Sequence, residues 1–265
     1  MSAVAARPGF RGAGVCAPMA VPCPERRSPM AAHRLSATAT QPALTWPPLA
    51  RNPMAAETSR KAHAMQPETH ALVVVDVQND FCPGGALAVP DGDAVVPGIN
   101  ALMEDFATVV LTQDWHPPRH GSFASEHPGR APLEVVEMPY GPQVLWPDHC
   151  IQGSHGAAFH PALRTDPAHL VIRKGFRRAI DSYSAFFEND HTTPTGLEGY
   201  LRTRGVDRLT MVGLATDFCV QYSALDAVRL GFAVTLRENL CRGIDLDGSL
   251  AQARDAMRAA GVVPG

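Results

Sequence analysis

The sequence has few features that would direct it to a membrane or to a nucleic acid. Of its 265 residues only 18% are charged, and the formal net charge is −3. No stretch approaches the roughly eighteen consecutive apolar residues of a membrane span, and no basic stripe interleaved with aromatic residues marks a nucleic-acid-binding face. The composition therefore predicts one globular domain of ordinary core size, without a membrane or nucleic-acid partner.

Cysteine is scarce and irregularly spaced. The six cysteines are Cys16, Cys23, Cys82, Cys150, Cys219 and Cys241. None of them forms a C-x-x-C pair, and in a chain of this length such spacing does not indicate a disulfide framework. We therefore expect reduced thiols and a cytoplasmic protein.

Residues 1–66 lack the periodicity of a folded domain. They are rich in Ala, Pro and Arg and carry eight Lys/Arg against two acids. Such a segment buries too little apolar surface to offset its ordering entropy, so we expect disorder. It could be a flexible tail, a targeting peptide, or an extension read from a start codon too early, with Met65 as the natural start. Because it lacks a continuous apolar stretch typical of secretion signals, we favour an over-extended start or a dispensable tail.

Residues 67–265 alternate between apolar runs and helical spacing. Strands are predicted at 71–77, 108–115, 169–175, 208–216 and 233–239, and helices at 95–106, 197–206, 217–232 and 249–262. Strands alternating with helices predict an α/β domain with a doubly wound, mostly parallel sheet and helices on both faces. Ligands bind such sheets beyond the carboxyl ends of the strands. The long Pro/Gly-rich connection 116–168 is expected to shape this site.

Three chemically active side chains are expected at that edge of the sheet. Cys219, in GLATDFCV, lies where a strand turns into a helix, whose N-terminus would stabilise a thiolate and offer free N–H groups to an oxyanion. Asp76 and Lys174 end two other strands. Each alone has an ordinary interpretation, as a small buried residue or a solvated strand end. Together they favour a cysteine nucleophile with a proton acceptor and a nearby cation.

A second cluster lies in DWHPPRHGSF (114–123) and WPDHC. It comprises Asp114, His116, His120 and His149. These are donor types of a borderline-metal site, although the prolines rule out assuming helical i,i+4 geometry. Single histidines here would more often be surface or packing residues, but three with an acid favour a metal. Whether that metal would activate water or only hold a ligand stays open from the residues alone.

These motifs resemble those of the nicotinamidases (pyrazinamidases) of the isochorismatase-like hydrolase superfamily. The resemblance runs from about residue 70 to the C-terminus. It rests on VDVQNDFCPGGAL, QDWHPPRHGSFAS, LWPDHCIQGSHGAAFHP, VIRKG and VGLATDFCV, in this order. No position that carries a function in this family departs from its pattern here.

The resemblance implies a role for each of these positions. It implies a catalytic triad of Asp76, Lys174 and Cys219, and one zinc, iron or manganese ion on Asp114, His116, His120 and His149. It also implies a cis peptide bond between Leu214 and Ala215, and an oxyanion hole formed by the backbone amides of Ala215 and Cys219. Phe81 and Trp146 would flank the substrate ring.

The activity implied is hydrolysis of nicotinamide to nicotinic acid and ammonia through a cysteine thioester, in NAD salvage, with pyrazinamide as a further substrate. The metal would bind the pyridine nitrogen rather than activate water, and the enzyme could be a homo-oligomer. Three alternatives remain. A related cysteine amidohydrolase for a carbamoyl or ureido substrate would not need the complete Asp/His set, and an isochorismatase proper would lack the nucleophilic cysteine. A non-catalytic metal- or ligand-binding module would not need the triad.

Overall fold

The computed structural model describes residues 66–265. They all belong to one compact unit of the chain. The predictions for residues 1–65, namely disorder and the choice among tail, targeting peptide and early start, lie outside the described residues. Across the residues that are described, every helix is too short or too polar to cross a membrane.

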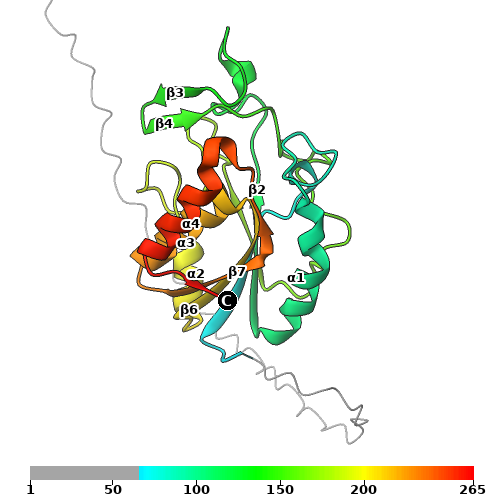
Figure 1. Cartoon of the computed structure of the whole chain (residues 1–265), viewed down its shortest axis with the longest axis vertical. Helices are drawn as coiled ribbons and strands as arrows, with labels where there is room; N and C mark the ends of the chain where they lie inside the picture. Colours follow the sequence, from blue (N-terminus) through cyan, green and yellow to red (C-terminus); the bar gives the residue numbers. More distant parts are fainter. Residues whose placement is uncertain (1–65) are drawn as a thin grey trace, which may run out of the picture. The chain divides into compact units, whose positions relative to one another are not determined.

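Six strands form one sheet in the order β5-β2-β1-β6-β7-β8, and all neighbouring pairs are parallel (Figure 1). These strands are β1 His70–Val75, β2 Thr108–Asp114, β5 Leu170–Lys174, β6 Arg208–Leu214, β7 Ala233–Arg242 and β8 Val263–Pro264. A separate antiparallel hairpin consists of β3 Val135–Met138 and β4 Gly141–Val144. The predicted doubly wound α/β fold is confirmed.

Helices cover both faces of the sheet. They are α1 Val96–Leu102, α2 Leu197–Thr203, α3 Gln221–Arg229 and α4 Ser249–Ala259. Short turns of 3-10 helix are η1 Asn79–Phe81, η2 Gly92–Val95, η3 Met103–Asp105, η4 Ala124–Glu126 and η6 Leu246–Gly248, and η5 Thr216–Val220 is a π-helical turn. In Figure 1, α1 lies on one side of the sheet and the other three α-helices lie on the opposite side.

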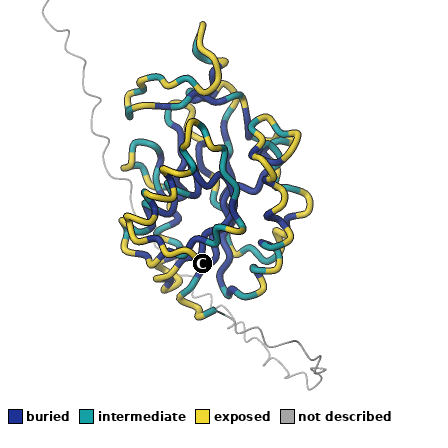
Figure 2. Tube along the Cα trace, in the orientation of Figure 1, coloured by how far each residue is buried: buried dark blue, intermediate teal, exposed yellow. Residues whose placement is uncertain are grey.

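The central strand β1 packs against the helices on both faces of the sheet. Its alternate residues Ala71, Val73 and Val75 belong to the core cluster on the side of α2, α3 and α4. Leu72 and Val74 point the other way, into the cluster that contains residues of α1. All five side chains are at most 1% exposed, and burying each of the larger ones contributes about 1.5–3 kcal/mol. Figure 2 shows the resulting buried centre under an exposed rim of turns.

All nine predicted elements are present, but the structure adds three strands and divides two helices. The predicted helix 95–106 consists of α1 followed by η3. The predicted helix 217–232 consists of η5 followed by α3. The hairpin β3–β4 escaped prediction because its strands are four residues long and half exposed, without a continuous apolar run. The third addition, β8, has two residues.

The order of the strands defines where a ligand should bind. The chain runs outward from β1 to β2 and β5, then returns to β6 on the other side of β1. The boundary between β1 and β6 is therefore the point at which the winding reverses. In parallel sheets a crevice opens there, beyond the carboxyl ends of the strands.

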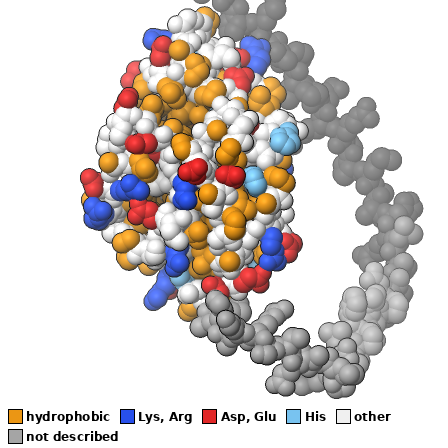
Figure 3. All heavy atoms as spheres, turned by 45° about the vertical axis from the view of Figure 1, so that its right-hand side comes forward, with side chains coloured by type: hydrophobic (Ala, Val, Ile, Leu, Met, Phe, Trp, Pro, Cys, Tyr) orange, Lys and Arg blue, Asp and Glu red, His pale blue; other side chains and the backbone are white. Residues whose placement is uncertain are grey.

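The face shown in Figure 3 has no cluster of charged side chains of one sign that would indicate a second binding site. Basic and acidic groups are interspersed there and do not gather by sign. This distribution offers no footprint for a polyanion on that face.

Candidate active site

Four neighbouring strands bring the predicted triad and one predicted metal ligand into a row. Lys174 ends β5 and pairs in register with Asp114, the last residue of β2. Asp76 directly follows β1, and Cys219 lies in η5, after β6. All four are buried, with at most 7% of their surface exposed. The structure thus brings these residues together as the sequence predicted.

The Lys174 side chain contacts the other three residues of this row. Its Nζ atom lies 2.9 Å from Asp76 Oδ2 and 2.9 Å from Asp114 Oδ1. The same ammonium donates to the Ser182 carbonyl oxygen at 2.9 Å and lies 3.4 Å from Cys219 Sγ. Because the side chain is fully buried, its charge is tolerable only with such partners. Lys174 therefore fixes two carboxylates and the thiol relative to one another.

Asp76 is arranged to accept a proton. Its Oδ1 accepts a hydrogen bond from the Thr112 hydroxyl at 2.5 Å. Its Oδ2 lies 2.9 Å from the Lys174 ammonium, with which it forms a buried ion pair. Burial raises the pKa of the Asp76 carboxyl, although the Lys174 charge opposes this. The same carboxylate lies close enough to the Cys219 thiol to raise its pKa.

The surroundings of Cys219 raise the pKa of its thiol. Burial raises its pKa well above the ordinary value; Lys174 lowers it, and the neighbouring Asp76 raises it further. A thiolate in this position must therefore form by transfer of its proton to a neighbouring group. Asp76 is the acceptor that the geometry provides.

Hydrogen bonds of the Asp217 side chain stabilise the turn that carries Cys219. The buried Asp217 carboxylate accepts the backbone N–H groups of Ile244 at 2.9 Å and Asp245 at 2.7 Å. These bonds tie η5 to the loop after β7. The peptide bond between Leu214 and Ala215 is cis, as the resemblance implied, and Ala215 precedes the first residue of η5.

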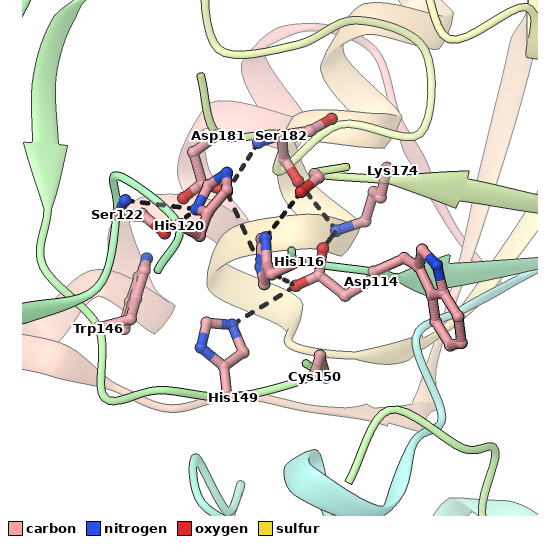
Figure 4. Close-up of polar contacts among 12 residues, drawn as sticks. Asp114, His116, His120, Ser122, Trp146, His149, Cys150, Lys174, Asp181 and Ser182 are labelled. Carbon is pink, nitrogen blue, oxygen red and sulfur yellow. Dashed lines mark hydrogen bonds and ion pairs between the residues drawn. The ribbon is translucent and has the colours of Figure 1, made fainter. Parts of the chain in front are cut away.

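Three of the four predicted metal ligands form one group. The ligand atoms of Asp114, His116 and His149 all lie within 4.8 Å of one another. His116 Nε2 is 3.1 Å and His149 Nε2 is 3.5 Å from Asp114 Oδ2 (Figure 4). Their Nδ1 atoms lie 2.9 Å and 2.8 Å from the carbonyl oxygens of Gly175 and Pro147. Since a carbonyl only accepts, each Nδ1 carries a proton, which leaves Nε2 as the ring nitrogen that could bind a metal.

Gly175 makes the contact with His116 possible. Its φ is +65°, and a Cβ atom there would lie 2.5 Å from His116 Cε1. A larger residue would both strain the backbone and displace the ring. The residue after Lys174 thus helps to orient His116.

His120, the fourth predicted ligand, lies beside this group. Its Nε2 lies 2.9 Å from the Arg177 carbonyl oxygen, and its Nδ1 lies 2.8 Å from the Ser122 hydroxyl. Both ring nitrogens thus face protein partners, and His120 falls in a second group of possible ligands with His116 and Asp181. Its ring packs on that of His116, with centroids 4.3 Å apart. The predicted role of His120 as a metal ligand stays a prediction.

A pocket with about 330 Å³ of unoccupied space connects the thiol with the metal group. Its lining includes both predicted ring-binding residues, Phe81 and Trp146. The complete lining is Phe81, Leu87, Asp114, Trp146, His149, Asp181, Tyr183, Ala215, Phe218, Cys219 and Ile244. A flat apolar ring with one reactive substituent suits such a pocket, because most of its wall is hydrophobic and its polar groups lie together.

The sequence did not single out Asp181, Tyr183 and Phe218. The Tyr183 hydroxyl accepts hydrogen bonds from Trp146 Nε1 at 3.1 Å and from Gln143 Nε2 at 3.0 Å. Two signals were present: the aromatic-rich stretch DSYSAFFEND after the third predicted strand, and the phenylalanine next to Cys219. The spacing of the residues in these two stretches does not indicate which side chains face a pocket.

The parallel sheet and the site above it define the class of this protein, an isochorismatase-like α/β hydrolase. The isochorismatase domain family matches residues 70–264. The chain belongs to the isochorismatase family.

Two relatives show how specific the similarity is within that family. The nicotinamidase of Acinetobacter baylyi is 55% identical over 192 residues, which cover 72% of this chain and 90% of the relative. The nicotinamidase/pyrazinamidase of Mycobacterium tuberculosis is 40% identical over 197 residues, covering 72% of this chain and 96% of the relative.

Solved structures agree with these relatives. A nicotinamidase/pyrazinamidase from Acinetobacter baumannii superposes with a TM-score of 0.74 at 60% identity, covering 75% of this chain and 96% of its own. A pyrazinamidase of Pyrococcus horikoshii in complex with zinc has a TM-score of 0.61 at 36% identity. The match covers 75% of this chain and 99% of the pyrazinamidase chain.

Proposed function

We propose that this protein is a nicotinamidase, which hydrolyses nicotinamide to nicotinic acid and ammonia for NAD salvage and also accepts pyrazinamide. The observation that carries the proposal is one apolar pocket lined by both the Cys219 thiol and the metal-binding group of Asp114 and His149. The identity of 55% to a nicotinamidase over most of that relative's length supports the same substrate. The enzyme is thus an amidohydrolase that acts on a linear amide.

The triad residues act on the amide through a thioester. Asp76 accepts the thiol proton, and the Cys219 sulfur attacks the carboxamide carbon while Lys174 stabilises the negative charges. The backbone N–H groups of Ala215 and Cys219 hold the oxygen of the tetrahedral intermediate. Asp76 returns the proton to the departing ammonia, and then activates the water that hydrolyses the thioester.

The metal site selects and orients the substrate. Asp114, His116 and His149 fit a divalent ion, because their three ligand atoms converge and the Nδ1 hydrogen bonds of both rings leave Nε2 as the nitrogen for the metal. When bound, zinc, iron or manganese would supply a Lewis acid for the pyridine nitrogen of the ring. Phe81 and Trp146 flank that ring, and His120, which packs on His116, is the predicted fourth ligand.

The redox state of the cysteines supports a cytoplasmic enzyme. Four cysteines lie in the described part of the chain, and all four are free and buried: Cys82, Cys150, Cys219 and Cys241. A protein that keeps its thiols reduced is typical of that compartment. The small-molecule amide is the partner that we propose, and a homo-oligomer stays a prediction.

Comparative kinetics test this function. Ammonia release would be measured with nicotinamide, pyrazinamide, benzamide and a carbamoyl amino acid, on metal-replete and chelator-stripped enzyme. We expect turnover of the two ring-nitrogen amides, with a large rise in KM after stripping. Equal rates on benzamide, or no effect of stripping, would contradict the anchoring of the ring by the metal. Preference for the carbamoyl substrate would favour the related amidohydrolase instead.

A further inference from the structure

Asp181 is a buried carboxylate without a basic partner. Only 2% of its surface is exposed, and it lines the substrate pocket. Its Oδ2 accepts a hydrogen bond from Gln143 Nε2 at 2.9 Å, and its Oδ1 accepts the Ser182 backbone N–H at 2.8 Å. Both donors are neutral. Of the lysines and arginines that the structure describes, none pairs with it, and His116 Nε2, at 4.0 Å, is the ionisable nitrogen within ion-pair distance.

The charges buried around the pocket do not balance without a cation. Asp76, Asp114 and Asp181 bring three carboxylates to this region, whereas Lys174 brings one ammonium. Two negative charges therefore remain, and a proton on His116 would compensate only one of them. Buried carboxylates are normally paired or bound to a metal, because an isolated buried charge is costly. A divalent cation would neutralise the remainder.

We propose that Asp181 is a positioning residue that supplies the second negative charge of the metal centre and thereby selects a divalent cation. This inference rests on the metal site of the proposed function. Asp181 lies beside that site: its ligand atom falls within 4.8 Å of those of His116 and His120. Figure 4 shows Asp181 and His120 next to His116, whose own Nε2 faces Asp114. Asp181 acts through its charge on the ion and on His116, and not as one of the three ligands.

The unpredicted hairpin holds this carboxylate in place. Gln143 belongs to β4 and is fully buried. Its amide donates to Asp181 Oδ2, while its Oε1 accepts from Asn189 Nδ2 at 3.2 Å. Because the amide nitrogen of Gln143 can only donate, this hydrogen bond requires Asp181 Oδ2 to act as an acceptor. The hairpin β3–β4 thus joins the metal centre to the loop that follows β5.

Metal affinity, measured without substrate, tests the inference. Full-length wild type, Asp181→Asn, Asp181→Glu and the control Asp148→Asn would be stripped and titrated with Mn²⁺ and Zn²⁺ against a fluorescent chelator. Asp148 is a suitable control because it adjoins His149 in sequence but its side chain is exposed and bonds to Ser125. We expect Asp181→Asn to weaken both metals about 10–100-fold, the range for partners of metal ligands. Asp181→Glu should recover part of this loss, and Asp148→Asn should stay within about threefold of wild type.

A folded Asp181→Asn variant that binds both metals as tightly as wild type would overturn the inference. If this variant unfolds when stripped, the rise in Tm on adding Mn²⁺ replaces the titration. A rise equal to that of wild type would again refute the role of the charge, and a smaller rise would support it. Failure of the wild type to bind either metal would instead refute the metal site itself, whereas equal binding by wild type and variant would refute only the role of Asp181.

Discussion

Replacing Asp76 with Asn tests the central step of the mechanism with little change of shape. The carbonyl oxygen of Asn can still accept the Thr112 hydroxyl hydrogen bond that Oδ1 now receives. The amide group, however, cannot take the proton of the Cys219 thiol. Burial raises the pKa of that thiol, so we expect its deprotonation to be slower without this acceptor.

The size of both effects follows from the contacts of Asp76. A general base contributes about 10²–10⁴-fold to a rate, and we expect the upper end because the thiol is so weakly acidic here. The stability loss should be smaller than for a fully broken buried ion pair, which costs about 3–5 kcal/mol. Lys174 would keep Asp114 and the Ser182 carbonyl oxygen, each at 2.9 Å. We therefore expect about 1.5–3 kcal/mol, the range for a hydrogen bond to a charged group.

Three measurements separate chemistry from folding. Ammonia release at saturating nicotinamide gives kcat, urea denaturation gives the free energy of unfolding, and alkylation by iodoacetamide followed by peptide mapping gives the reactivity of Cys219. We expect kcat to fall about 10⁴-fold and alkylation of Cys219 to slow. Bound metal should stay at the wild-type level, because Asp76 is outside the group of Asp114, His116 and His149.

A kcat within tenfold of wild type in a folded, metal-containing Asp76→Asn protein would refute the assignment of Asp76 as the proton acceptor. Slow turnover with unchanged alkylation would refute it as well, because the variant would then fail at a later step. The exposed substitution Asp148→Asn controls for loss of one negative charge near the pocket and should leave kcat unchanged.

Three further predictions follow from the same geometry. Cys219→Ala should abolish turnover while metal content, measured by elemental analysis, stays intact; appreciable residual activity would favour hydrolysis by a metal-bound hydroxide. Since burial raises the pKa of Asp76 and only its ionised form accepts a proton, kcat/KM should fall with decreasing pH above the range of an ordinary aspartate. An acid limb at or below about pH 4, with metal occupancy checked at each pH, would contradict this. Gly213→Ala should destabilise the fold by roughly 3 kcal/mol in urea denaturation, because φ is +113° and a Cβ would lie 2.1 Å from a β1 carbonyl oxygen. Gly196→Ala, with φ +101° and no atom within 4 Å, is the matched control and should cost only the backbone strain.

The sequence predicts what depends on local periodicity and on strand ends. Continuous apolar runs placed β1, β2, β5, β6 and β7, and the parallel arrangement then put Asp76, Asp114 and Lys174 on one edge without any knowledge of distances. The register that sets Asp114 opposite Lys174 follows from the pairing of β2 with β5. Residues that share a sheet edge can thus be inferred from the pattern alone.

Contacts made by loops could not be predicted in this way. Gln143 and Asp181 are 38 positions apart and meet through a hairpin whose half-exposed strands show no apolar run. The role of His120 depends on which way its ring turns: its nitrogens face Ser122 and Arg177. Residue type and spacing are the same for a metal ligand and for a residue that supports one, so only the orientation of the ring distinguishes them.

Asp114 joins the nucleophile to the metal centre, because its two oxygens face different partners. Oδ1 lies 2.9 Å from the Lys174 ammonium, and Oδ2 lies 3.1 Å from His116 Nε2. Burial raises the pKa of this carboxyl, but His116 and Lys174 outweigh that effect and hold it well below its ordinary value, so Asp114 stays ionised. A change in the charge at the metal centre would therefore affect Lys174 through the Asp114 carboxylate. Because Lys174 also contacts Asp76 and the Cys219 thiol, both of these groups would be affected in turn. Removing the metal should accordingly alter the reactivity of Cys219 as well as the affinity for substrate, although the proposed mechanism gives the metal no step in breaking the amide bond.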